Sequence, residues 1–305
     1  MLDIDSHLVL PQSVENKKIN ILTRINRKIG SIFNKYNIEG KKNYPPYKTI
    51  DFYYWKPTEG VNFGDELSKT VVTLMLARKG FTLFDEVQNR KNFLAIGSVL
   101  SHASDKSVIW GSGLNGHIPE RDHRYSDLDV RAVRGPLTGE FLKRRGIRAP
   151  EIYGDPALLL PILLNGRFKK NIIHKIGIIP HFRDYERTRK LIELEKIKGI
   201  QIIDAKQSWN CAVEQILQCE IILSSSLHGL VIADAYGIPN NYIRISDEEP
   251  LLKFHDYYLG TNRNLSIYTS LKDAVKSANL PNFIFNSDIL IEAFPYDIWT
   301  NLIKL

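Results

Sequence analysis

The sequence predicts an α/β protein of two open, mostly parallel domains that face each other across a cleft. Apolar, strand-like runs alternate with helical segments along two stretches of the chain, and a turn-rich linker separates these stretches. Short polar clusters follow several of the predicted strands. Because ligands of open parallel sheets bind beyond the carboxyl ends of the strands, these clusters predict where the site lies.

The first alternation is expected between residues 49 and 165. Its apolar runs suit strands of a parallel sheet that is buried on both faces. We expect strands at 51–55, 81–84, 93–96, 107–110, 129–133 and 152–153, and helices at 64–79 and 136–145. Pro136 suits the start of the second helix, and Gly146 suits its end.

The second alternation is expected between residues 172 and 285, after a linker with a turn at Asn165-Gly166. We expect strands at 176–180, 200–203, 221–223 and 241–245, and helices at 185–198, 209–218 and 271–278, with a further helix between the serines at 224–226 and Gly237. Residues 286–305 supply a terminal helix over 287–302, which can pack back on the first domain.

Residues 1–48 form a basic N-terminal arm. Between residues 17 and 36 the chain has six basic residues and no acidic one, and apolar residues recur there at helical spacing. One interpretation is a helix that docks on an anionic membrane surface. The other is a helix that packs its apolar stripe on its own domain.

Composition excludes several classes of protein. The chain has 305 residues, of which 43% are hydrophobic and 25% are charged, and no apolar run is long enough for a membrane span. No signal peptide is visible, which predicts a cytoplasmic protein. Cys211 and Cys219 would lie about 12 Å apart in one helix, too far for a disulfide. No metal-binding spacing or nucleic-acid-binding motif accompanies the net charge of +7.

The most informative segment runs from residue 220 to residue 239. It reads as a strand, a serine-rich elbow and a helix that ends at Gly237. With Ser225 as the N-cap, His228 lies in the first helical turn, where unpaired N–H groups bind anions. The alternative is an elbow whose histidine is only structural.

Other strand ends carry polar residues too. Gly64 suits a close backbone approach, and Asp65 either caps the next helix or binds a ligand hydroxyl. Arg134 follows another strand and can bind phosphate or carboxylate, unless it pairs with Asp155. Arg183 ends the first strand of the second half, in a turn that is either ligand-binding or only solvated.

These clusters together resemble the polysaccharide pyruvyl transferase family. The matching pieces keep their order over about residues 55 to 245, and they are Asn62-x-Gly64-Asp65, Gly111-Ser-Gly113, Val133-Arg-Gly-Pro-Leu-Thr138, Gly154-Asp155-Pro156, His181-x-Arg183-Asp184, Ser225-Ser-Leu-His-Gly229 and Ala235-Tyr-Gly-Ile-Pro239. The family often has arginine directly before Leu-His-Gly, where this chain has Ser226. Arg134 and Arg183 are then expected to carry more of the charge.

The resemblance implies two Rossmann-like domains in a glycosyltransferase-B-like arrangement. It also implies phosphoenolpyruvate as donor and, as acceptor, a sugar hydroxyl pair of a glycan or undecaprenyl-linked oligosaccharide, with no metal or cofactor. We expect the donor to contact Arg134, His181, Arg183, Ser225, Ser226, Leu227 and His228. We expect the acceptor to contact Asn62, Gly64, Asp65, Ser112 and Gly113.

For ketal formation we expect His228 to act as general acid or phosphate anchor, and Asp65 to bind or deprotonate the acceptor. Two rival functions remain. A nucleotide-sugar-dependent glycosyltransferase uses the same architecture, and Glu248 or Glu249 would then bind the sugar. The other rival is a membrane-surface scaffold without activity. An acceptor linked to lipid would place the protein at the inner face of the membrane.

Overall fold

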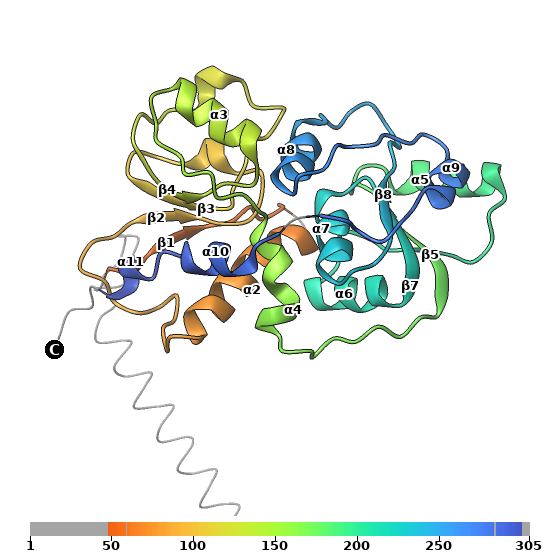
Figure 1. Ribbon diagram of the computed structural model, residues 1–305, viewed down its shortest axis with the longest axis horizontal. Coiled ribbons are helices and arrows are strands. Elements are labelled where there is room, and N and C mark those ends of the chain that lie inside the picture. Colours follow the sequence, from red (N-terminus) through yellow and green to blue (C-terminus); the bar gives the residue numbers. More distant parts are fainter. Residues whose placement is uncertain (1–47, 59, 284, 301–305) are drawn as a thin grey trace, which may run out of the picture. The chain divides into compact units, whose positions relative to one another are not determined.

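Two four-stranded parallel sheets form the framework of the protein, and helices cover both faces of each sheet (Figure 1). The computed structural model describes residues 48–58, 60–283 and 285–300. The basic segment 17–36 therefore lies outside the described residues. The predicted α/β class with parallel strands is confirmed.

The first sheet has the strand order β1-β2-β3-β4. Its strands are β1 (Asp51–Tyr53), β2 (Asn92–Leu94), β3 (Ser107–Trp110) and β4 (Leu128–Ala132). Successive side chains of a strand point to opposite faces, so Phe93 and Leu94 belong to different core clusters. On one face lie α2 (Phe63–Ala77), α10 (Ser287–Glu292) and α11 (Asp297–Thr300), and on the other lies α3 (Pro136–Arg144) (Figure 1).

The second sheet has the strand order β6-β5-β7-β8. Its strands are β5 (His174–Ile179), β6 (Ile200–Ile202), β7 (Cys219–Ser224) and β8 (Asn240–Tyr242). One face packs on α6 (Trp209–Leu217) and α7 (Leu227–Ala235), and the other packs on α5 (Tyr185–Glu195) and α9 (Leu271–Lys276). The two central strands, β5 and β7, are thus buried over most of their length, as their apolar sequences predict.

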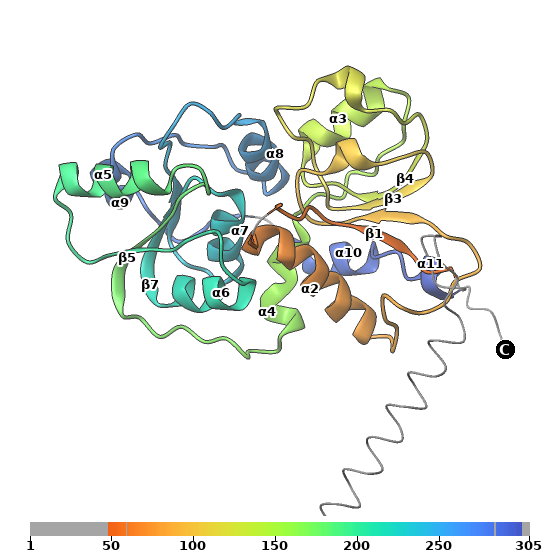
Figure 2. The same ribbon diagram turned by 180° about the vertical axis from the view of Figure 1, so that it is seen from behind.

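A continuous apolar core joins the two sheets. Helix α2, a 3₁₀ helix (Pro156–Leu159) and α4 (Leu160–Leu163) lie between the sheets in both views (Figures 1 and 2). Leu67 of α2 and Leu159 share one buried cluster with side chains from both sheets. The described residues accordingly form a single compact unit.

Some expected elements differ in the structure. Residues 81–84 form a turn instead of a strand, because the Thr82 N–H and hydroxyl both donate to the carboxylate of Asp85. The expected terminal helix is interrupted before Pro295, whose ring cannot continue a helix. Helix α6 ends at Leu217, which places Cys219 in β7, and both cysteines are free.

The structure also contains a helix that is not predicted from the sequence, α8 (Leu252–Gly260). It follows the loop after β8 and lies near α3 (Figure 1). Among the described residues, no helix has both the length and the apolar character needed to cross a bilayer.

Candidate functional site

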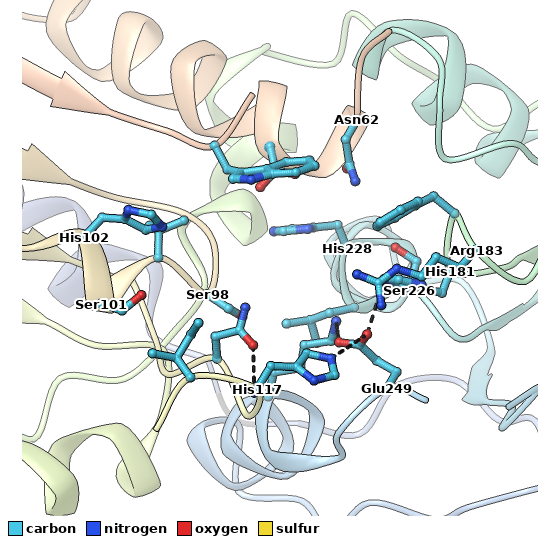
Figure 3. Close-up of a pocket in the computed structure, with 18 residues that line it drawn as sticks. Asn62, Ser98, Ser101, His102, His117, His181, Arg183, Ser226, His228 and Glu249 are labelled. Atoms are coloured by element: carbon cyan, nitrogen blue, oxygen red, sulfur yellow. Dashed lines mark hydrogen bonds and ion pairs between the residues drawn. The ribbon is translucent and has the colours of Figure 1, made fainter. Parts of the chain in front are cut away.

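One pocket of about 320 Å³ collects the side chains that follow six strands, three from each sheet (Figure 3). The first sheet contributes Trp55 and Asp65 after β1 and His117 after β3. The second contributes His181 after β5 and His228 after β7. Because parallel strands bring their carboxyl ends to one edge of a sheet, residues distant in sequence meet here.

The elbow between β7 and α7 is held by its serines. Ser224 Oγ accepts a hydrogen bond from the Ser226 N–H at 3.0 Å and lies 2.8 Å from the Ile179 carbonyl oxygen. Ser225 Oγ accepts from the His181 N–H at 2.8 Å, which ties the loop after β5 to the elbow. The N-cap is Ser226 instead of Ser225, and α7 begins at Leu227. Leu227 and His228, the first two residues of α7, line the pocket, and backbone N–H groups at these two positions have no acceptor within the helix.

His228 lies in this first turn with its side chain 12% exposed. Its ring packs against Gly64, where an added Cβ would come within 2.2 Å of Nδ1. Its Nε2 lies 3.6 Å from Asp155 Oδ2, and neither atom has a hydrogen-bond partner among the described residues. Burial, aided by the charges of Lys253 and Arg134, lowers the pKa of His228 to about 3, so the imidazole is neutral.

Asp65 is a second titratable group of the pocket, in the first turn of α2. Burial raises its pKa to about 7, against the opposing effect of Lys253. Asn62 is the N-cap of the same helix, since its Oδ1 accepts from the Gly64 N–H at 3.0 Å. Asp65 is consequently not needed as the cap, and a carboxyl with this pKa can accept or release a proton near neutral pH.

Glu249 has three basic neighbours in the pocket wall. Its Oε1 accepts from Lys253 Nζ at 2.5 Å, and its Oε2 lies 3.4 Å from His181 Nε2 and 3.5 Å from His117 Nε2. Dashed lines in Figure 3 join Glu249 to the two imidazoles. Burial lowers the pKa of His181, and Glu249 opposes this effect.

Arg134 does not line the pocket, contrary to the expectation of direct contact with the donor. It is fully buried, and its guanidinium donates to Asp256 Oδ2 at 3.1 Å, to Ser98 Oγ at 2.8 Å and to the Leu114 carbonyl at 2.9 Å. The partner is Asp256 of α8, not Asp155. All of its nitrogens are occupied, so its role in the structure is to hold α8 against the first sheet.

Several other residues expected to touch a ligand also lie behind the pocket surface. Ser112 is buried and its Oγ donates to the Gly97 carbonyl at 3.1 Å. Gly113 leaves room for the guanidinium of Arg134, since an added Cβ would lie 2.3 Å from its Cζ. Gly64 and Ser225 support His228 and His181 in the ways described above. The expected residues that line the pocket are Asn62, Asp65, His181, Arg183, Ser226, Leu227 and His228.

Arg183 is exposed at the pocket edge, and its guanidinium lies 5.2 Å from the centroid of the Phe182 ring. Within the part of the chain that the structure describes, no carboxylate lies within ion-pairing distance of it. A guanidinium without an acidic partner at the rim of a pocket is suited to an incoming anion.

Lys253 and His117 line the pocket although no sequence motif points to them, and Glu249 is expected from the sequence only for the rival function. Lys253 escapes notice because α8 is not predicted. A signal is present, since Phe254, Tyr257 and Tyr258 recur at helical spacing, but no N-cap residue precedes them. The described residues contain no cluster of three or more potential metal ligands.

Comparison with known proteins gives consistent matches. The profile of the family described as polysaccharide pyruvyl transferase matches residues 62–247. An uncharacterized protein of Acanthamoeba polyphaga mimivirus is 29% identical over 216 residues, which cover 69% of this chain and 74% of that protein. The succinoglycan biosynthesis protein ExoV of Rhizobium meliloti is 28% identical over 211 residues, which cover 67% of this chain and 63%, less than two thirds, of that protein.

A solved structure of an uncharacterized Klebsiella pneumoniae protein aligns with 73% of this chain and 94% of its own. The sequence identity is 13% and the TM-score is 0.43, so this likeness carries no argument about the site.

Proposed function

The chain belongs to the polysaccharide pyruvyl transferase family, and on this premise we propose that it moves the pyruvyl group of phosphoenolpyruvate onto two hydroxyls of one sugar. The acceptor is a bacterial surface polysaccharide or its lipid-linked precursor, and the products are a pyruvate ketal and phosphate. The likeness to a protein of succinoglycan biosynthesis supports a polysaccharide acceptor. The pocket carries the proposal, because acid–base groups and anion-binding groups meet there at six strand ends.

The donor needs two anion-binding positions, since phosphoenolpyruvate has a phosphate and a carboxylate on one stiff frame. The open N–H groups of Leu227 and His228 supply one such position at the N-terminus of α7. The helix dipole favours an anion there by typically 0.3–1 kcal/mol. Arg183 supplies a second position at the rim.

In the proposed reaction the methylene carbon of the donor gains a proton while a sugar hydroxyl oxygen bonds to the central carbon. The second hydroxyl oxygen then bonds to the same carbon, and the C–O bond to phosphate breaks. Of the two hydroxyl protons, one balances the proton added to the methyl group and the other leaves with phosphate. Asp65, with a pKa raised to about 7 mainly by burial, is the group suited to accept a hydroxyl proton.

His228 is neutral in the structure, because burial lowers its pKa to about 3. A neutral imidazole offers one N–H donor and one acceptor. A bound phosphate would raise its pKa by opposing the charges of Lys253 and Arg134, and the imidazole would then serve as proton donor or phosphate anchor. We place the acceptor beside Asp65 and the donor against α7.

The decisive assay supplies the purified protein with phosphoenolpyruvate and a candidate glycan or lipid-linked oligosaccharide. Phosphate release is measured, together with a mass increase in the acceptor that corresponds to a pyruvyl ketal. His228→Ala should remain folded and lose this activity. Parallel reactions with nucleotide sugars test the glycosyltransferase, and sugar transfer in place of pyruvyl transfer would refute the proposal.

A lipid-linked acceptor would require work at the inner face of the membrane, and the basic segment 17–36 would then help by docking on anionic lipid. This segment lies outside the described residues. Liposome flotation of the full chain and of a variant that lacks residues 1–40 tests the idea. Equal binding of both proteins to anionic vesicles would refute it.

A further inference from the structure

Lys253 contributes to the pocket an ammonium group that the proposed reaction has not yet used. We propose that Lys253 binds the phosphate group of the donor, exchanging its ion pair with Glu249 for the ligand, an inference that rests on the proposed function for the identity of the donor. Lys253 is the second residue of α8, and its side chain is only 15% exposed.

The ammonium lies among the reacting groups. Lys253, Asp65 and His228 line the same pocket of about 320 Å³. The charge of Lys253 lowers the pKa of Asp65 and the pKa of His228, against burial in the first case and together with it in the second. A ligand that touches either group is therefore within the electrostatic reach of Lys253.

Glu249 allows Lys253 to exchange its ion-pair partner for a phosphate at a small cost in free energy. A buried ammonium without a counter-charge is strongly unfavourable, and Glu249 supplies that counter-charge in the ligand-free protein. When Lys253 turns to a phosphate, Glu249 keeps the imidazoles of His181 and His117 at 3.4 and 3.5 Å. The phosphate then supplies the counter-charge of Lys253, and Glu249 retains the two imidazoles as polar neighbours.

The ion pair is not needed to anchor α8. Asp256 accepts from the Thr138 N–H at 3.0 Å and from the Thr138 hydroxyl at 2.7 Å, in addition to its bond with Arg134. The hydroxyl of Tyr257 donates to Asp234 at 2.6 Å. These buried contacts fix the helix independently, so the position of Lys253 on the pocket wall calls for another explanation.

The chemistry of the two pocket cations favours a division of roles. The compact ammonium of Lys253 acts as a point charge, which suits phosphate at the buried end. The planar guanidinium of Arg183 suits the carboxylate at the rim. Ser226, which lines the same pocket at the start of α7, offers only a hydroxyl.

The test compares Lys253→Met with Lys143→Met. Lys143 forms a surface ion pair with Glu151 at 2.9 Å and serves as the control. For Lys253→Met, the KM for phosphoenolpyruvate and the inhibition constant of inorganic phosphate should rise about 10- to 100-fold. This is the loss of affinity expected when one charge-assisted hydrogen bond is removed. The KM for the acceptor should stay within about twofold, and Lys143→Met should match the wild type.

Two further variants make the result independent of one substitution. Glu249→Gln should lower the inhibition constant of phosphate, because it removes the carboxylate that is paired with Lys253. Ser226→Arg added to Lys253→Met should restore part of the donor affinity by returning a cation to the pocket.

If a folded Lys253→Met protein shows unchanged donor KM and unchanged inhibition by phosphate, the inference about Lys253 is wrong. The proposed function would still stand, because the wild-type protein would still transfer the pyruvyl group. Equal losses for donor and acceptor, with no recovery from Ser226→Arg, would also overturn it. A wild-type protein that binds inorganic phosphate through Lys253 but transfers no pyruvyl group would instead refute the proposed function.

Discussion

Gly64 occupies a position where any side chain would collide with the ring of His228. A Cβ at Gly64 would lie 2.2 Å from Nδ1 and 2.6 Å from Cγ of that ring. Gly64 is a buried residue in the first turn of α2. The absence of a side chain there leaves room for the imidazole that lines the pocket.

Gly64→Ala should therefore lower pyruvyl transfer by about 10²-fold while the protein stays folded, because the displaced imidazole loses its place in the pocket. Gly139→Ala is the matched control, since a Cβ there meets its nearest neighbour at 3.6 Å, an ordinary contact in helix α3. Steady-state kinetics and circular dichroism of both variants check this. Full activity in Gly64→Ala would contradict a role for the position of His228.

Asp65 should impose a pH dependence on the reaction. If the carboxylate accepts a hydroxyl proton, kcat/KM falls as pH decreases through about 7, the pKa to which burial raises Asp65. Asp65→Asn should remove that limb together with most of the activity. A wild-type profile that is flat between pH 5.5 and 8, within about twofold, would rule Asp65 out as the base.

The raised pKa of Asp65 also predicts that replacing this carboxylate stabilises the folded protein at alkaline pH. The pKa of Asp65 in the folded protein, about 7, exceeds the ordinary pKa of an aspartate, 3.8, so ionisation opposes folding. The stability that the protonated carboxyl contributes is complete below pH 3.8 and is lost as pH rises through about 7. Thermal unfolding should show that Asp65→Asn is more stable than the wild type at pH 8, with little difference at pH 4.

At the level of elements, the strand-end clusters were predictable and α8 was not. Buried parallel strands are recognised in the sequence by their apolar runs. The predicted strand, elbow and helix are present as β7 and α7, and His228 lies in the first turn of α7. Helix α8 has no side-chain N-cap, and it contains Phe254, Tyr257 and Tyr258, which have modest helix propensity. Its stability comes from tertiary contacts of Asp256 and Tyr257, which a single sequence does not reveal.

The position of Arg134 shows a second limit of sequence reasoning. The alternation of β4 places an arginine at the strand end, but it cannot say whether the guanidinium turns to solvent or inward. The carboxylate that turns it inward is Asp256, 122 residues away in the chain. Such a long-range pair carries no local signature.

Asp256→Asn should destabilise the protein by about 3–5 kcal/mol, because it leaves the buried guanidinium of Arg134 without a counter-charge. Glu151→Gln, which breaks an exposed ion pair with Lys143, should leave stability nearly unchanged. Urea denaturation measures both. An Asp256→Asn protein of normal stability but weakened donor binding would return Arg134 to the list of donor ligands.

At the scale of the whole molecule, α10 and α11 near the end of the described chain pack on one face of the first sheet. Trp110 of β3 donates its indole N–H to the Leu290 carbonyl of α10 at 2.9 Å. Phe294 packs edge-on against Trp110 with ring centroids 4.8 Å apart, and Trp299 is fully buried against Phe93. Both strands that meet these rings lie far earlier in the chain.

Trp299→Ala should lower the free energy of unfolding by about 3–5 kcal/mol, because it leaves a large cavity in an aromatic cluster. The control is Phe84→Ala, because the side chain of Phe84 is 78% exposed and its removal should leave stability within about 0.5 kcal/mol. Denaturant unfolding compares the two variants. Similar losses would mean that α11 contributes little to the core.

The core that joins both sheets has a consequence for how the protein is made. A growing chain delivers β1 to β4 and α2 first, yet the part of the sheet face that packs on α10 and α11 stays uncovered until residues 287–300 have left the ribosome. Because both sheets contribute to one core, that core is complete only after these residues have been synthesised. Until then the apolar side chains of β2 and β3 that pack on Phe294 and Trp299 are exposed, which makes this part of the growing chain prone to aggregation.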